Sequence, residues 1–384
     1  MKKCIKCGLP ETFETIEFNP DGVCNVCVQH TFKSENIDWA ARKITFDNLI
    51  EQYRGKYEYD CIIPFSGGKD STFTLYYLMK EYNLKPLVVQ FNHGFMRPQL
   101  LKNNEKTFKT LGVDVISFTP NWKVVQRVML EALIRKGDFC WHCHTGIFSY
   151  PMHIAIKYNT PLVLWGEPST EYTAYYDYRD DEIEVVDEAR FNRITNLGIT
   201  AEDMRGMIED DLNHYDARDF TPYTYPSTRD LKKLRYQSLC LGSFIPWDTK
   251  MQSQLIMDEL GWEGDEVEGM PPKIYDYEKI ECSMQGVRDY IKFLKRGYSR
   301  VTQMTVLDIR NGRMSKDEAD KLIQRYEGKK PQSLKLFLEY VGITEEKFNQ
   351  LVAKTVVAPF EPDFSKDEWN PKPHDYDQWY SAKS

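Results

Sequence analysis

Short apolar runs alternate with longer amphipathic segments through the first half of the chain. Four runs rich in Val, Ile, Leu and Phe suit buried parallel strands, at residues 61–65, 86–91, 114–118 and 161–165. Apolar residues recur with helical spacing between and beside these runs, at residues 73–79, 100–111, 122–135 and 147–158. Alternating strands and helices of these lengths predict an α/β fold built on a doubly wound parallel sheet.

The second half of the chain has a mainly helical pattern. Amphipathic segments predict five helices, at about residues 285–295, 301–310, 316–327, 333–340 and 345–355. Residues 171–230, which lie between the two halves, are rich in tyrosine and charge and are typical of an insertion that carries substrate choice. The last thirty residues contain several prolines and predict an extended tail, which Trp369 and Trp379 would pack down.

Composition and charge narrow the class of protein. The chain has 384 residues, with 50 Lys and Arg against 58 Asp and Glu, which gives a net charge of −8. This balance makes nucleic acid an unexpected partner. No apolar run approaches membrane-spanning length, and no apolar segment of a secretory signal follows Met1, so we expect a cytoplasmic protein without a membrane partner.

Four of the nine cysteines lie close to the N-terminus. Cys4 with Cys7 and Cys24 with Cys27 form two C-x-x-C pairs, separated by sixteen residues. This spacing is typical of a zinc ribbon. Four thiolates close a tetrahedral Zn²⁺ site and leave no open position for chemistry, so we expect a structural metal.

A glycine-bearing loop follows the first predicted strand and precedes a helix. Two adjacent glycines let backbone N–H groups approach an anion, and the start of the helix adds its positive end. The predicted nucleotide contacts in this loop are Ser66, Gly67, Gly68, Lys69, Asp70, Ser71 and Thr72. Lys69 would add charge against phosphate oxygens, and Asp70 suits a metal-side ligand or a helix cap. The alternative is a tight βα turn with an ordinary cap.

Polar residues also follow the second and fourth predicted strands. Residues just past strand ends face the ligand crevice of an open α/β sheet, so Asn92 and Gly166 are predicted nucleotide contacts. His93 is a further candidate contact, or a turn residue. Glu167, or the nearby Glu171, could assist proton transfer or hold Mg²⁺, although both equally suit surface acids.

A third C-x-x-C pair, Cys140 and Cys143, has two histidines interleaved with it. The pair is a candidate ligand set for a second metal or an iron–sulfur cluster, with Cys240 as a candidate third ligand. The alternative is a knuckle that packs against the nucleotide site.

These features divide the chain into four predicted parts. They are a zinc ribbon (1–30), a helical linker (31–57), a nucleotide-binding α/β domain with its insertion (58–245), and a mainly helical region for substrate or partner (246–384).

Ser66-Gly67-Gly68-Lys69-Asp70-Ser71 resembles the loop of the PP-loop ATP pyrophosphatase superfamily, whose members split ATP into AMP and pyrophosphate. The resemblance implies the adenine nucleotide α-hydrolase-like fold, and a catalytic role for Lys69, Asp70 and Glu167. Three later stretches resemble the N-acetyl sugar amidotransferases of O-antigen and flagellar sugar pathways, at residues 244–248, 293–302 and 308–315. Arg300 and Arg310 match basic positions of that family and would bind a carboxylate or phosphate of the sugar. Salt bridges on a helix surface are the alternative.

The resemblance implies a two-step reaction that uses ATP and Mg²⁺. The acetamido oxygen of an N-acetylated sugar, either nucleotide-linked or acidic, attacks the α-phosphorus, and ammonia then displaces AMP to give an acetamidino sugar. Two partners are implied as the source of ammonia: a glutamine-hydrolysing subunit and a channel-forming barrel subunit, both similar to those of histidine biosynthesis.

Two other functions remain open from the sequence. A tRNA thiolation enzyme of the same superfamily would share the zinc knuckles and the loop, and would carry an iron–sulfur cluster at Cys140 and Cys143. A non-catalytic scaffold would keep the fold alone, but the intact loop argues against it.

Overall fold

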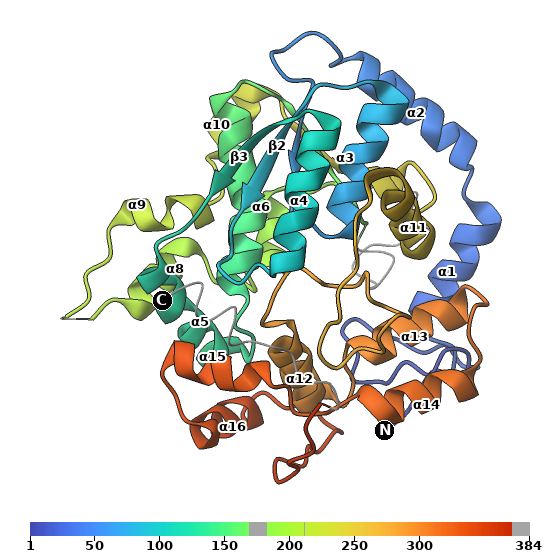
Figure 1. Ribbon diagram of the computed structural model, residues 1–384, viewed down its shortest axis with the longest axis vertical. Coiled ribbons are helices and arrows are strands. Elements are labelled where there is room, and N and C mark those ends of the chain that lie inside the picture. Colours follow the sequence, from blue (N-terminus) through green and yellow to red (C-terminus); the bar gives the residue numbers. More distant parts are fainter. Residues whose placement is uncertain (169–182, 211, 371–384) are drawn as a thin grey trace.

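A five-stranded parallel sheet lies at the centre of the computed structural model, which describes residues 1–168, 183–210 and 212–370 (Figure 1). The strands are β1 (Cys61–Pro64), β2 (Pro86–Phe91), β3 (Asp114–Phe118), β4 (Leu162–Trp165) and β5 (Gln237–Cys240). Their order is β3-β2-β1-β4-β5, and each neighbouring pair is parallel. The predicted doubly wound parallel sheet is confirmed. The edge strand β5 was not predicted, because half of its short sequence is polar.

The two faces of the sheet are both buried, since alternate residues of each strand point to opposite sides. Cys61 and Ile63 of β1 join the apolar core on one face, whereas Ile62 joins the core on the other. In β4, Leu164 and Val163 divide in the same way. This explains why the central strands β1, β2 and β4 are almost wholly apolar, whereas the edge strands β3 and β5 also carry polar residues.

Helices cover each face of the sheet. One face is covered by α3 (Lys69–Tyr82), α4 (Pro98–Leu111) and α11 (Thr249–Leu260), and the other by α6 (Trp141–Lys157) and α10 (Thr228–Leu234). The helices α5 (Trp122–Lys136) and α8 (Ala201–Ile208) pack beside α6. The helix predicted at 147–158 is α6, which begins six residues earlier, at Trp141. Cys140 and Cys143 of the third C-x-x-C pair thus lie at the start of this helix instead of forming a knuckle.

The C-terminal helices form a second layer below the sheet in the view of Figure 1. They are α12 (Gln285–Arg296), α13 (Arg300–Arg310), α14 (Lys316–Tyr326), α15 (Ser333–Val341) and α16 (Glu345–Ala353). Each lies within two residues of its predicted bounds. The apolar residues of α12, α15 and α16 share a core with α5, which joins this layer to the α/β domain.

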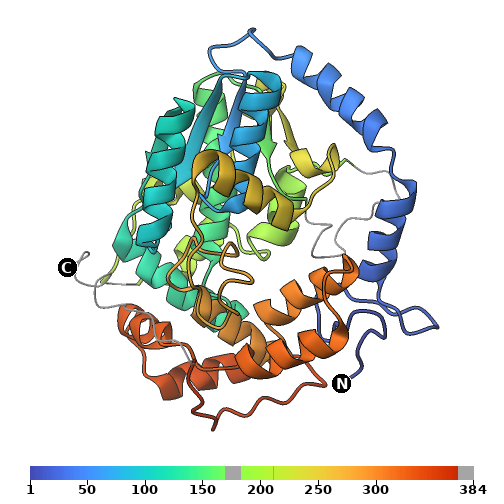
Figure 2. The ribbon, with the colours of Figure 1, turned by 45° about the vertical axis from the view of Figure 1, so that its right-hand side comes forward.

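The N-terminal segment packs against the C-terminal layer. Its four cysteines share a core with Tyr298, which precedes α13, and with Val306, which lies within α13. Figure 2 shows the N-terminal residues beside α13 and α14. The predicted linker consists of two helices, α1 (Asn25–Asn36) and α2 (Trp39–Glu51). They separate at Asp38, whose carboxylate caps α2 by accepting a hydrogen bond from the Ala41 N–H at 3.0 Å.

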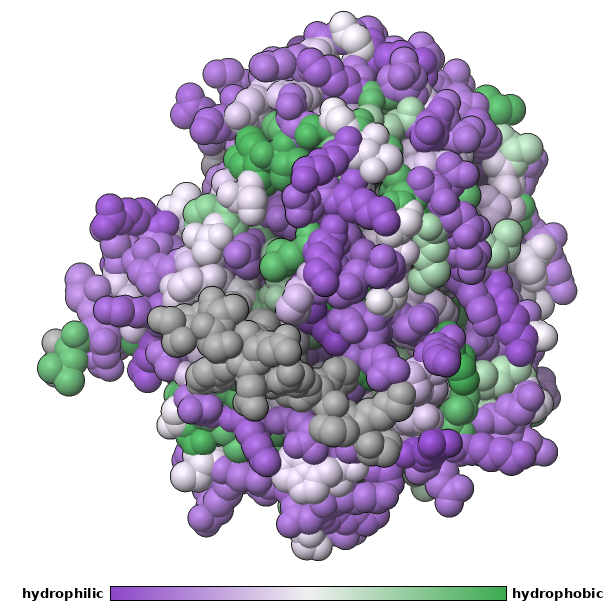
Figure 3. All heavy atoms as spheres, viewed as in Figure 1, coloured by the Kyte–Doolittle hydropathy of each residue, from purple (hydrophilic) through white to green (hydrophobic). Residues whose placement is uncertain are grey.

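The described part of the insertion consists of short elements. They are α7 (Glu188–Arg190), the π-helix η3 (Phe191–Thr195), α8, α9 (Ala217–Phe220), the 3₁₀ turn η4 (Thr221–Tyr223) and α10, with a further 3₁₀ turn, η5 (Leu241–Ser243), after β5. Glu171 and Trp379 lie outside the described residues. No described helix is both long and apolar enough to cross a membrane. The face in Figure 3 is mainly hydrophilic, with apolar side chains in small groups.

Candidate active site

The loops that follow β1 and β4 meet at the carboxyl edge of the sheet. These two strands are neighbours, although the chain passes through β2 and β3 between them. Ligands bind at such a switch point in open α/β sheets. Gly166, at the end of β4, lies so close to α3 that a Cβ there would be 2.6 Å from Thr74 Oγ1 and 3.0 Å from the Asp70 carbonyl oxygen. Only glycine therefore fits at position 166, where the loop after β4 passes the first turns of α3.

The loop at residues 65–68 is held open by its own hydroxyl groups. Gly67 has a φ of 88°, and its N–H donates to Ser71 Oγ at 3.1 Å. The Gly68 N–H donates to Ser66 Oγ at 3.3 Å. No side chain caps the start of α3, so the N-terminus of the helix is available to an anion. This geometry agrees with the predicted phosphate loop.

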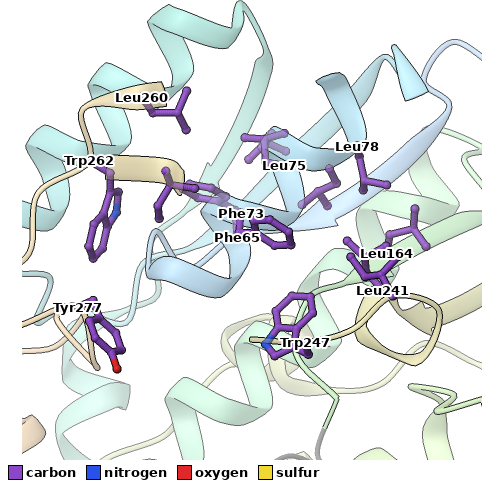
Figure 4. Packing of buried hydrophobic residues seen from close by; sticks show 14 of the residues in the cluster. Phe65, Phe73, Leu75, Leu78, Leu164, Leu241, Trp247, Leu260, Trp262 and Tyr277 are labelled. Carbon is purple, nitrogen blue, oxygen red and sulfur yellow. The ribbon is translucent and has the colours of Figure 1, made fainter. Parts of the chain in front are cut away.

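The C-terminal region packs directly onto this loop. Trp262 Nε1 donates a hydrogen bond to the Gly67 carbonyl oxygen at 3.3 Å, and Figure 4 shows Trp262 and Tyr277 beside the start of α3. A Cβ at Gly68 would lie 1.9 Å from Glu281 Oε1. Any side chain at position 68 would therefore displace Glu281.

Lys69 is buried between two carboxylates. Its Nζ lies 2.8 Å from Asp70 Oδ2 and 2.8 Å from Glu278 Oε2. Burial alone would raise the pKa of Glu278, but the charges of Lys69, Lys279 and Arg300 hold this pKa at about 2. A phosphate near Lys69 must join this ion-pair network. Sequence reasoning missed Glu278, which lies far from the loop in the chain and in no motif.

Glu167 and Asp70 provide oxygens beside the loop. Among the described residues, Asp70 Oδ1 and Glu167 Oε1 are buried without a hydrogen-bond partner. Burial, together with the charge of Asp70, raises the pKa of Glu167 to about 8. Carboxylate oxygens are the ligands that Mg²⁺ prefers, so these two residues fit a magnesium ion that accompanies a nucleotide.

The predicted contacts after β2 have local partners. Asn92 Oδ1 accepts a hydrogen bond from the Gly94 N–H at 2.9 Å, which stabilises the turn. His93 is buried, and its Nδ1 accepts from the Phe95 N–H at 3.3 Å. His93 thus makes the contact expected of a turn residue, and it also lines a cavity that includes Ser66 of the loop.

A small cavity rich in cysteine adjoins the phosphate loop. It has a volume of about 160 Å³, and its lining includes Ser66, Cys140, Cys143 and Cys282; we call it the sulfur pocket. Cys282 was not predicted to lie here, because it is far from the C-x-x-C pair in the chain. Cys240, the expected third ligand, instead lies at the end of β5, where its Sγ accepts from Arg190 Nη1 at 3.6 Å.

The three thiols of the sulfur pocket are protonated at neutral pH. Burial raises the pKa of Cys282 to about 11 and raises the pKa values of Cys140 and Cys143 further. Burial also lowers the pKa of His142 to about 4. A thiol that coordinates a metal is deprotonated outright. Binding of a metal would therefore convert these three thiols into thiolate ligands.

A second, larger cavity adjoins the sulfur pocket. It has a volume of about 320 Å³, and Phe139, His144 and Arg288 line both cavities. We call it the basic cavity, because its cationic side chains outnumber its acidic ones. The cations are Arg190, Arg288, Lys292, Lys295, Arg296 and Arg300.

The two predicted substrate arginines have different surroundings. Arg300 lines the basic cavity and pairs with Glu278 Oε1 at 3.4 Å and with Asp289 Oδ1 at 3.7 Å. Arg310, at the end of α13, is largely buried and lines neither of the two described cavities. The helical periodicity of α12 predicted a helix but not the cavity that its cations line.

The N-terminal cysteines form a closed group. The ligand atoms of Cys4, Cys7, Cys24 and Cys27 all lie within 4.8 Å of one another, and all four residues are buried. The Cys24 N–H donates to Cys4 Sγ at 3.3 Å, as in metal knuckles. Four thiols at this spacing fit one Zn²⁺, which would stabilise this short segment.

The C-terminal third of the chain matches a known family. Residues 273–379 match the family model described as LPS biosynthesis protein WbpG-like, C-terminal domain. This match confirms, for that region, the resemblance to a family of lipopolysaccharide biosynthesis. The region includes α12 and α13, and therefore most of the cations of the basic cavity.

Other proteins are similar over different parts of the chain. An uncharacterised protein of Methanocaldococcus jannaschii, MJ1599, is 28% identical over 31% of this chain and 50% of its own length. The chain thus spans about half the length of the curated relative it matches.

Two solved structures were compared with the fold. The U34-tRNA thiolase NcsA from Methanococcus maripaludis, with its [4Fe-4S] cluster, has a TM-score of 0.34 and 13% identity over 96% of this chain and 94% of its own. A Methanocaldococcus jannaschii structure described as a predicted subunit of tRNA methyltransferase has a TM-score of 0.23 and 18% identity over 49% of this chain and 92% of its own. Both TM-scores are low. The fold of this chain is therefore described by its own strand order and not by likeness to these two structures.

Proposed function

We propose that this chain is an ATP-dependent, AMP-forming amidotransferase that converts an N-acetyl group of a sugar into an acetamidino group. The pathway would be that of a surface polysaccharide, such as lipopolysaccharide O-antigen, or of a flagellar glycan. One observation carries the proposal: the WbpG-like region lines the basic cavity, and this cavity adjoins the phosphate loop through the sulfur pocket.

The basic cavity suits an anionic sugar. Arg288, Lys292 and Arg300 provide donors for a carboxylate or for the phosphates of a nucleotide-linked sugar. Phe148 and Ile291 provide apolar surface in the same cavity, where a methyl group of an acetamide could pack. The acetamide must reach the nucleotide site for reaction, and Phe139, His144 and Arg288, which line both cavities, are the side chains that lie between the two sites.

The chemistry needs no side-chain nucleophile. The acetamide oxygen attacks the α-phosphorus of ATP, the bond to pyrophosphate breaks, and the oxygen becomes a good leaving group as part of AMP. Ammonia then adds to the acetamide carbon and loses a proton, and the C–O bond breaks to release AMP and the acetamidino sugar. Positioning and stabilisation of charge supply most of the catalysis.

Residues around the loop divide these tasks. The N-terminus of α3 and the loop before it would hold the pyrophosphate end of ATP, and Asp70 with Glu167 would hold the accompanying Mg²⁺. In the second step, after magnesium pyrophosphate has left, Glu167 would accept the proton that ammonia loses, since its high pKa makes it a better base than an ordinary carboxylate. Lys69 would balance the charge that develops on pyrophosphate.

The proposed nitrogen source is a pair of partners. A glutamine-hydrolysing subunit and a barrel subunit that channels ammonia, both similar to those of histidine biosynthesis, would complete the assembly. A reaction that consumes ATP in this way suits the cytoplasm.

The direct test uses the purified chain with Mg²⁺, ATP and ammonium, and a set of nucleotide-linked and acidic N-acetyl sugars. We expect AMP in equal amount to an acetamidino product for at least one sugar, and none with Asp70→Asn. Glu268→Gln is a matched control, since it also removes a buried carboxylate but lies away from the loop. Product formed without any nitrogen donor, or with ADP in place of AMP, would contradict the proposal.

A tRNA thiolation enzyme is the second candidate. Three thiols beside the phosphate loop favour it, because Cys140, Cys143 and Cys282 could bind an iron–sulfur cluster. Such a cluster would supply an iron site that can bind and deliver sulfur. Iron and sulfide in anaerobically purified protein, together with salt-dependent binding of tRNA, would support this function. Absence of tRNA binding at low salt would exclude it.

A further inference from the structure

Glu278 lies between the two anion sites of the proposed function. It is only 1% exposed. One carboxylate oxygen lies 2.8 Å from Lys69 Nζ, and the other lies 3.4 Å from Arg300 Nη1. Lys69 begins α3 directly after the phosphate loop, whereas Arg300 lines the basic cavity. One carboxylate thus contacts a cation of each site.

The contacts continue on both sides as a chain of alternating charges. Lys69 also pairs with Asp70 at 2.8 Å, and Arg300 also pairs with Asp289 at 3.7 Å. The five side chains run from the phosphate loop to the wall of the basic cavity. Lys69, Glu278, Arg300 and Asp289 are largely buried, so water screens the interactions between them only weakly.

A buried charge needs a partner, and Glu278 is shared by two. When an anion binds at Arg300, it neutralises that cation, and the negative charge of Glu278 is then compensated by Lys69, its contact on the side of the loop, and by the nearby Lys279. The electrostatic potential at the phosphate loop becomes more negative, which weakens binding of pyrophosphate there. The same argument applies in reverse, because coupling between two binding sites is reciprocal.

We propose that Glu278 is a positioning residue that couples the two sites: an anionic sugar bound in the basic cavity lowers the affinity of the phosphate loop for pyrophosphate. The proposal rests on the two anion sites of the proposed function, but not on its reaction. Its consequence is that the bound sugar weakens the hold of the loop on the pyrophosphate group both before and after ATP is cleaved, which favours release of pyrophosphate once the adenylate has formed. Because Glu278 belongs to the WbpG-like region, this region would act on the nucleotide site as well as on the sugar.

The test measures binding of magnesium pyrophosphate to the full chain by calorimetry, which requires neither a sugar nor turnover. Arg300→Met should weaken binding about fivefold or more, and Glu278→Gln should strengthen it by a similar factor. In the Glu278→Gln background, Arg300→Met should change the affinity less than about twofold. Glu268→Gln, which removes another buried carboxylate of the C-terminal region, should leave the affinity unchanged.

The sign of the effect separates coupling from a structural role, since a loosened loop would bind pyrophosphate more weakly in Glu278→Gln. Equal effects of Arg300→Met in both backgrounds would overturn the proposal. If Glu278→Gln does not fold, the Arg300 variants decide alone: Arg300→Lys, which keeps the charge, should retain the wild-type affinity, and weakening equal to that of Arg300→Met would overturn the proposal. Failure of the amidotransferase reaction would leave these binding results unaffected.

Discussion

Two sets of cysteines in this chain share the C-x-x-C spacing but differ in geometry. Cys4, Cys7, Cys24 and Cys27 bring their sulfur atoms within 4.8 Å of one another, as a single metal ion requires. Cys140, Cys143 and Cys282 line one cavity, yet the described residues of the sulfur pocket form no such tight group. The first set is closed and lies away from the phosphate loop, whereas the second adjoins it.

The comparison shows that spacing in sequence does not determine the role of a cysteine pair. The N-terminal pairs belong to one short segment with only a small apolar core, so a metal bound by the four cysteines would add to its stability. The pair at Cys140 opens a long helix that is already buried by the sheet and by α5. We therefore expect the second set to contribute less to folding than the first.

The largest effect should follow loss of the first set. Cys24→Ser should abolish binding of Zn²⁺ and lower the free energy of unfolding by more than about 4 kcal/mol, because the segment packs against α13 and depends on its metal. Zinc analysis and denaturant unfolding measure both. If the protein without zinc were as stable as the protein with zinc, the two sets of cysteines would not differ in their contribution to folding, and the comparison would be wrong.

The second prediction concerns the raised pKa of Glu167, beside the phosphate loop. Its pKa is about 8 in the folded protein, well above the ordinary value near 4.5. The unfolded chain therefore loses this proton first as pH rises, and the free energy of unfolding should fall by roughly 3 kcal/mol between pH 5 and pH 8. Glu167→Gln should remove that part of the decrease. Identical pH profiles for the two proteins would show that Glu167 titrates normally.

Loss of the second set should cost much less stability. Cys282→Ala should change the free energy of unfolding by about 1 kcal/mol, while removing any iron that anaerobically purified protein contains. Cys61→Ala serves as a comparison, because Cys61 lies in β1 away from the sulfur pocket and should keep any iron, although its deeper burial should make the loss of stability larger than for Cys282. Iron retained in Cys282→Ala but lost in Cys240→Ala would restore Cys240 as the third ligand.

The smallest effect should come from Glu14, by which the N-terminal segment contacts the basic cavity. Its carboxylate lies 3.4 Å from Arg296 Nε and 3.7 Å from Lys292 Nζ. Glu14→Gln removes a negative charge from the cavity, so binding of UDP-N-acetylglucosamine should strengthen about twofold, as measured by calorimetry. Weaker binding would indicate that Glu14 holds Lys292 and Arg296 in position for the ligand instead of competing with the ligand for them.

The sequence predicted features whose causes are local. The apolar runs of β1 and β2, the zinc pairs and the phosphate loop each depend on residues adjacent in the chain. Glu278, Cys282 and the cations of α12 are part of the site only because the C-terminal layer folds back onto α3 and α6. No short motif encodes that contact, which is why the helix was predicted and the cavity was not.

The central claim is that the acetamide oxygen attacks ATP. It can be tested with an N-acetyl sugar that carries ¹⁸O in its acetamido carbonyl, incubated with the protein, Mg²⁺, ATP and ammonium, followed by mass spectrometry of the AMP. The account predicts that one ¹⁸O moves from the sugar to the phosphate of AMP for each acetamidino group formed. AMP without label, in the presence of acetamidino product, would contradict it.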